Sequence, residues 1–335
     1  MIPLRVLPSP PRPEASKVPL FPQNTMEFIL SWLARFLIWL VQTMPLVWAA
    51  RMGRSAGWLA WVLDRRHRTA AVENLRLAFG SELSEFEIQS IASEHFKRLG
   101  ENYTSAIKTA SMSDAELRPH LEFINYPETL PPSKGISVYA IGHFGNFEII
   151  ARMQAWAGNR RLVTTYRALR SKALDALLQE LRRKSGILYF ERTKDAAALR
   201  STLHGGDILF GILSDQHAGK RGLWIPFFGR NCSTTAAPAV YALRFRAKLF
   251  VGACYRTRLA HWCLELSEAI PTHLPDGTAR STEAIMTEVN QHLERNVRRD
   301  PANWFWVHRR WKAPSAFQRG MEDPNPAVAG NSSGA

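Results

Sequence analysis

Short apolar runs alternate with helix-like segments through the middle of the chain. Apolar, partly β-branched runs predict strands at 136–142, 161–167, 187–191, 207–214 and 248–257. Segments with helical spacing predict helices near 146–157, 171–184 and 193–204. This alternation indicates an α/β fold, a layered mixed sheet flanked by helices, whose active site would lie at the carboxyl ends of strands.

Amphipathic helices are predicted on either side of this region. Between Asn74 and Lys108, residues 84–87 form a capping box, and the apolar residues that follow fall on one helical face. Residues 281–299 also place apolar side chains on one face. The segment from Pro301 to Lys312 then mixes aromatic and basic residues, which suits packing on the sheet, a membrane interface or stacking on nucleic acid.

A mostly apolar stretch from Phe28 to Ala50 precedes these elements. Its length of about 23 residues could cross a hydrocarbon core of about 30 Å, although Arg35, Gln42 and Pro45 interrupt it. We expect it either to span the membrane or to lie in the interface as an amphipathic anchor; the alternative is a buried core helix. Basic residues follow it from Arg51 onward, which by the positive-inside rule places the rest of the protein on the cytoplasmic side.

The formal net charge of +14 changes the range of partners to consider. Such a surface suits nucleic acid, an anionic bilayer or an acidic protein. The mean hydropathy of −0.20 excludes a chain with many membrane spans. Cys232, Cys254 and Cys263 have no Cys-x-x-Cys spacing, so neither a disulfide framework nor a zinc site is supported and a reducing compartment fits.

Candidate chemistry lies in the stretch from Gly142 to Glu148, directly after a predicted strand. His143 falls in the turn, and Glu148 falls in the first turn of the next helix. On one continuous helix, side chains five residues apart point about 140° apart, so these two can meet only if the segment is broken. Gly145 allows that break, and Asn146 suits the N-cap of a helix that runs to about residue 157.

A His–carboxylate pair at this position could act as a general base. With Glu148 on one ring nitrogen of His143, the other nitrogen could take a proton from a hydroxyl. No serine stands in a Gly-x-Ser-x-Gly setting and no cysteine is near, so direct transfer to an acceptor hydroxyl is simpler than a covalent intermediate. The alternative is a structural histidine at a strand end.

The stretch 142–148 resembles the His-x4-Asp/Glu motif of the lipid A biosynthesis lauroyl/myristoyl acyltransferase family, usually Gly-His-x-Gly-Asn-Trp-Glu, with Phe147 in place of the tryptophan. The resemblance extends from about Asn74 to Lys312. It implies a glycerol-3-phosphate-acyltransferase-like fold at the cytoplasmic face of a bacterial inner membrane. Acyl carrier protein would be the donor, and an acylated, phosphorylated glucosamine disaccharide, an anionic membrane glycolipid, would be the acceptor. No cofactor, metal or nucleic acid is implied.

Polar pairs at the ends of other predicted elements extend the candidate site. Asp215 follows a buried strand, so its carboxylate must find a partner or water. Three pairs, 166–167, 182–183 and 215–216, resemble the family's Tyr-Arg pair, arginine-rich segment and Asp-Gln pair. An arginine there would bind the thioester oxygen or an anionic head group, and Asp215 would hold that arginine or part of the loop. The residues expected to bind substrate or oxyanion are Asn146, Arg167, Arg183, Asp215 and Gln216; the choice of Arg183 over Arg182 is arbitrary.

These inferences divide the chain into four parts. We expect residues 1–25 to be a disordered leader, or an upstream extension if translation starts at Met26. We expect residues 26–68 to be the membrane-anchor helix and its basic flank, residues 69–315 the acyltransferase domain, and residues 316–335 a disordered tail. Two alternatives stay open: the same mechanism on another acceptor, such as a phosphatidylinositol mannoside or a glycerolipid, and a non-catalytic basic protein that binds membranes or nucleic acid.

Overall fold

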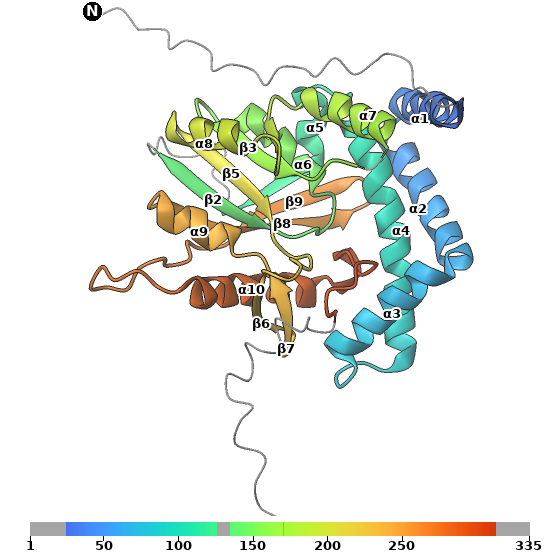
Figure 1. Cartoon of the computed structure of the whole chain (residues 1–335). Coiled ribbons are helices and arrows are strands. Elements are labelled where there is room, and N and C mark those ends of the chain that lie inside the picture. Colours follow the sequence, from blue (N-terminus) through green and yellow to red (C-terminus); the bar gives the residue numbers. More distant parts are fainter. Residues whose placement is uncertain (1–24, 126–134, 170, 313–335) are drawn as a thin grey trace, which may run out of the picture.

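The five predicted strands are consecutive neighbours in a seven-stranded sheet with the order β1-β9-β8-β2-β5-β3-β4. The computed structural model describes residues 25–125, 135–169 and 171–312 (Figure 1). The strands of this sheet are β1 (Leu121–Ile124), β2 (Ile136–Ile141), β3 (Arg161–Tyr166), β4 (Leu188–Glu191), β5 (Ile208–Leu213), β8 (Lys248–Arg258) and β9 (His261–Leu266). Neighbours run parallel except β8 and β9, which are antiparallel. The predicted layered mixed sheet is therefore confirmed.

Helices cover both faces of the sheet and one of its sides (Figure 1). The α-helices are α1 (Thr25–Thr43), α2 (Leu46–Leu63), α3 (Arg65–Phe79), α4 (Glu85–Thr109), α5 (Asp114–Leu117), α6 (Glu148–Ala151), α7 (Lys172–Arg183), α8 (Ala196–His204), α9 (Ala237–Arg244) and α10 (Thr282–Arg299). Short 3-10 helices are η1 (Arg118–His120), η2 (Arg152–Trp156) and η3 (Pro301–Asn303). A separate antiparallel ribbon is formed by β6 (Leu223–Phe227) and β7 (Arg230–Thr234).

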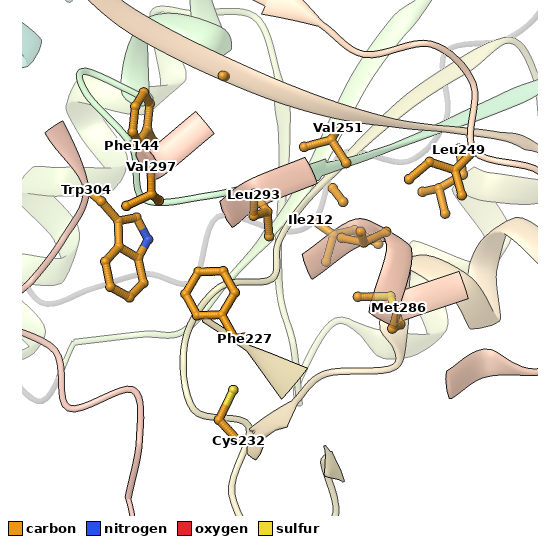
Figure 2. Packing of buried hydrophobic residues seen from close by; sticks show 14 of the residues in the cluster. Phe144, Ile212, Phe227, Cys232, Leu249, Val251, Met286, Leu293, Val297 and Trp304 are labelled. Carbon is orange, nitrogen blue, oxygen red and sulfur yellow. The ribbon is translucent and has the colours of Figure 1, made fainter. Parts of the chain in front are cut away.

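The apolar face predicted for residues 281–299 packs against the sheet. Met286, Leu293 and Val297 of α10 are buried in one hydrophobic cluster with Ile212 of β5 and Val251 of β8 (Figure 2). The opposite sheet face carries a second buried cluster, covered by α6 and η2. The sheet therefore separates two cores, and both extend to the carboxyl ends of its central strands.

The N-terminal apolar stretch is divided between two helices. Residues 28–50 fall on α1 and α2, and the break between these helices contains Pro45, which lacks the backbone donor that a helix interior needs. No helix in the described part of the chain is both long and apolar enough to cross a membrane, so the predicted span is not supported. The predicted leader and tail lie outside the described residues, apart from Thr25 at the start of α1.

Candidate active site

The register of two parallel strands places His143 beside Asp215. Ile141 and Leu213 lie opposite one another and are the last residues of β2 and β5, so the segments that follow leave the sheet side by side. The Nδ1 atom of His143 is 2.7 Å from Oδ1 of Asp215, and the backbone N–H of His143 donates to Oδ2, also at 2.7 Å. The Trp304 indole N–H donates to the same Oδ2 at 2.8 Å.

Asp215 is a buried carboxylate with donors on both oxygens. Its residue is 1% exposed. Burial by itself would raise the pKa of Asp215, but the His143 ring, the His143 backbone N–H and the Trp304 indole hold that pKa below its usual value. An ionised Asp215 accepts a hydrogen bond from the Nδ1–H of His143, which leaves Nε2 as the basic nitrogen of the neutral ring.

Glu148 does not bind His143, which corrects the predicted pairing. Its carboxylate binds the guanidinium of Arg182 on α7, with Oε1 2.5 Å from Nη2 and Oε2 3.3 Å from Nε. Burial alone would lower the pKa of Arg182, but Glu148 raises it above its ordinary value. Glu148 starts α6 and faces α7, whereas the Nδ1 atom of His143 faces the end of β5, so Asp215 takes the orienting role predicted for Glu148.

The turn between His143 and Glu148 depends on Gly145. Its φ is +61°, and a Cβ there would lie 2.1 Å from the carbonyl oxygen of Cys254. The predicted N-cap is wrong: α6 begins after Phe147 with no side-chain cap and continues as η2 rather than as one helix over 146–157. The side chain of Asn146 is buried, and its backbone carbonyl accepts the Ile149 N–H at 3.0 Å.

A cavity of about 680 Å³ opens beside His143. Apolar side chains from the sheet and η2 line its interior, including Tyr139, Ile141, Met153, Leu209 and Leu266. Cationic side chains line it as well: Arg167, Arg182, Arg192 and Lys312. A cavity that combines a large apolar interior with convergent polar groups is typical of a site for an amphiphilic substrate.

The structure brings together most of the predicted site residues. Arg167 and Gln216 line the cavity with His143 and Glu148, and the Nε2 atoms of Gln216 and His143 are 3.4 Å apart. Of the two neighbouring arginines, Arg182 lines the cavity, whereas the predicted Arg183 is exposed and is not among the lining residues. Asp215 was expected to hold an arginine or a loop, but its carboxylate binds His143 and Trp304.

Two contributions from the C-terminal aromatic segment were not predicted from the sequence. Trp304 binds Asp215, and His308 lines the cavity, where its Nε2 accepts the backbone N–H of His217 at 3.0 Å. Burial lowers the pKa of His308 to about 4, so this ring is neutral at pH 7. Asn74 ties the segment to α3 by donating to the carbonyls of Trp306 and His308. The high aromatic content of this segment was the only signal in the sequence. It indicated that the segment packs on the sheet, but it did not show which residues Trp304 and His308 contact.

Fold and site together define an α/β enzyme of the group-transfer kind. A histidine held by a buried aspartate can move a proton to and from a hydroxyl, and the adjoining cavity suits a substrate with a long apolar part.

Comparison with known proteins shows to which family this enzyme belongs. The family model for bacterial lipid A biosynthesis acyltransferases matches residues 22–313, so the chain belongs to that family and is an acyltransferase. It is 22% identical over 289 residues to a lipid A biosynthesis palmitoleoyltransferase of Escherichia coli, covering 84% of this chain and 91% of the relative. It is 24% identical over 307 residues to a lipid A biosynthesis acyltransferase of Haemophilus influenzae (88% and 95%). For the lauroyltransferase of Escherichia coli the identity is 23% over 303 residues (84% and 91%).

Proposed function

We propose that the chain transfers an acyl group from acyl carrier protein to a hydroxyl of a lipid A precursor, with His143 as the general base. The observation that carries this proposal is the bond between Nδ1 of His143 and buried Asp215, which directs the basic Nε2 nitrogen to the reacting groups. The cavity beside it has the apolar volume that an acyl chain needs.

The reaction proceeds by direct transfer. Nε2 of His143 takes the proton of the acceptor hydroxyl as its oxygen attacks the thioester carbonyl carbon. The tetrahedral intermediate collapses with cleavage of the carbon–sulfur bond, and the leaving thiolate receives the proton from Nε2. Asp215 stabilises the imidazolium that exists between these two steps.

Arg182 supplies positive charge in the same cavity. Glu148 fixes its guanidinium by two hydrogen bonds, which orients a side chain that would otherwise be mobile. This pair replaces the predicted His143–Glu148 dyad: Glu148 acts through Arg182, which stabilises the oxyanion or binds the anionic head group of the acceptor. Arg167 and Lys312 add charge along the same cavity.

The N-terminal helices would hold the chain at the inner membrane, with the cavity on the cytoplasmic side. Large apolar side chains exposed on α1 and α2 form what we call the N-terminal apolar surface: Phe28, Ile29, Leu30, Trp32, Leu33, Phe36, Leu37, Trp39, Trp48, Met52, Trp58, Leu59, Val62 and Leu63. An exposed apolar surface of this kind suits the membrane interface. Arg35 of α1 binds Glu180 of α7 at 3.2 Å, so this surface adjoins a helix that lines the cavity.

The test is acyl transfer from labelled acyl carrier protein to lipid A precursor, measured for the natural protein and for His143→Ala. Loss of the base should lower the rate by about two to four orders of magnitude. The matched control is His204→Ala, since His204 is exposed at the end of α8. Equal rates in the natural protein and His143→Ala would refute the mechanism. Transfer to a phosphatidylinositol mannoside or a glycerolipid in place of the lipid A precursor would refute the acceptor.

A further inference from the structure

The cavity continues from His143 along one face of the sheet. The register places Ile141, Leu213 and Gly252 in one row across β2, β5 and β8, next to the site. The next row inward contains Tyr139 and Gly211, and the one after that contains Leu209 and Leu162. These residues line the cavity, so it extends over three rows. At about 3.3 Å per residue, the first and third rows are about 13 Å apart.

Two glycines leave this face open beside Ile141. A Cβ at Gly211 would lie 3.0 Å from Cδ1 of Ile141, and a Cβ at Gly252 would lie 3.9 Å from Cγ1 of the same side chain and 3.5 Å from Cδ2 of Leu266. Both glycines line the cavity, and they occupy the two strands that flank β2. Because both positions lack a side chain, the cavity is wider on both sides of Ile141.

The backbone does not require glycine at either place. Neither Gly211 nor Gly252 has a positive φ, and the spaces around them hold side-chain atoms that can move. Glycine inside a strand weakens that strand, and it often marks a position where a ligand approaches the backbone closely. The reason for two glycines on one face thus lies in the cavity they line.

The third row also contains the first polar group on this face. Ser137 of β2 lies opposite Leu209, and its hydroxyl accepts a hydrogen bond from Nη2 of Arg160 at 3.0 Å. Arg160 is 5% exposed, so its guanidinium is buried. An alkyl chain that reached this point would remove polar groups from their partners at a free-energy cost, which sets an inner end for an apolar ligand.

We propose that Gly211 and Gly252 determine which acyl chains the enzyme transfers, by keeping open the path that the donor's linear acyl chain follows from His143 toward Leu209. This inference rests on the proposed function. The thioester carbonyl lies at His143, the chain lies against the sheet between the two glycines, and its terminal methyl group stops before Ser137 and Arg160.

The experiment compares Gly211→Val and Gly252→Val with the natural protein, using a series of straight-chain acyl donors and one acceptor. Each variant should keep transfer of the short donors and lose transfer of the long ones, by about tenfold for each methylene group that no longer fits. The matched control is Gly206→Val, because a Cβ at Gly206 meets no atom within 4 Å and the residue is not among those that line the cavity. It should keep the natural preference.

One further measurement separates the possible outcomes. Binding of free fatty acids of increasing length, followed by the rise in melting temperature, should show the same shift in length preference without any turnover. If neither the natural protein nor any variant transfers acyl groups but this shift is present, the proposed function is refuted and the proposed path for the acyl chain is supported. Unchanged length preference in both folded variants would overturn the inference.

Discussion

Asp215 holds His143 at two points, the backbone N–H and the Nδ1 atom of the ring, one with each carboxylate oxygen. The main chain and the side chain of His143 are therefore fixed by the same buried group. Trp304 donates to that group as well, so the C-terminal segment closes over it. A base oriented in this way needs little rearrangement when substrate arrives.

Asp215→Asn should lower acyl transfer by about three orders of magnitude. Oδ2 accepts two N–H donors, so the amide oxygen of asparagine will take its place and the amide N–H₂ will face Nδ1 of His143. Nδ1 must then accept, which moves the ring proton to Nε2 and removes the base. The rate of transfer measures this effect. Asp276→Asn, in an exposed turn, is the control and should transfer at the natural rate.

Glu148 and Arg182 should behave as one unit. Glu148→Ala and Arg182→Ala should each lower the transfer rate about tenfold to a hundredfold, and the double variant should lose little more than either single one, because both changes remove the same oriented guanidinium. Rates of the four proteins give the coupling free energy. Arg183→Ala, at the neighbouring position, is the control, and its transfer rate should be close to that of the natural protein. Additive losses would show that Glu148 and Arg182 act separately.

Trp304→Phe should move the acid limb of the pH–rate profile to higher pH. The indole N–H helps to lower the pKa of Asp215, so its removal raises that pKa and the carboxylate is protonated sooner as pH falls. Ionised Asp215 also stabilises the fold above its usual pKa, and this stabilisation is lost as pH falls through the depressed value. Trp306→Phe removes a bond to Pro301 instead and serves as the control, with an unshifted limb.

Much of this site could be predicted from the sequence because it depends on strand ends. The apolar runs at 136–142 and 207–214 placed His143 and Asp215 at the same edge of the sheet. What the sequence could not supply was the register of β2 on β5, which decides that Asp215 and not the nearer Glu148 contacts the ring. Glu148 was predicted as the partner of His143 because it is close in sequence. Asp215 is the partner in the structure because two strands far apart in the chain are paired.

Other features depended on contacts that leave no local pattern. The strands β1 and β9 at one side of the sheet were not predicted, and neither was the ribbon β6–β7, in which Pro226 argues against a strand. Trp304 belongs to a segment whose aromatic content was plain, but its bond to Asp215 joins residues 89 apart. The close approach of Gly145 to Cys254, which sets the turn before α6, also joins parts of the chain far apart in sequence.

His95 should make the protein less stable as pH falls from about 6.5 to 4. Burial lowers its pKa from 6.5 to about 4, so in this interval the unfolded state binds a proton that the folded state does not. His95→Gln should reduce the pH dependence of the free energy of unfolding by up to about 3 kcal/mol. Urea unfolding across the interval measures it. His308, whose pKa is also lowered to about 4, acts in the same direction and keeps part of the slope. An unchanged slope would contradict the assignment.

Trp32 and Trp39 of the N-terminal apolar surface should contribute to membrane binding. They are 61% and 59% exposed and lie seven residues apart, on one face of α1. Replacing either with serine should weaken binding to anionic vesicles about tenfold, since an aromatic ring no longer enters the interface. Vesicle sedimentation measures the bound fraction, with Phe86→Ser as the control, because Phe86 is 83% exposed but lies on α4, outside this surface. If the tryptophan variants bind as the natural protein does while the acyl transfer rate in detergent is also unchanged, α1 is not the element that contacts lipid.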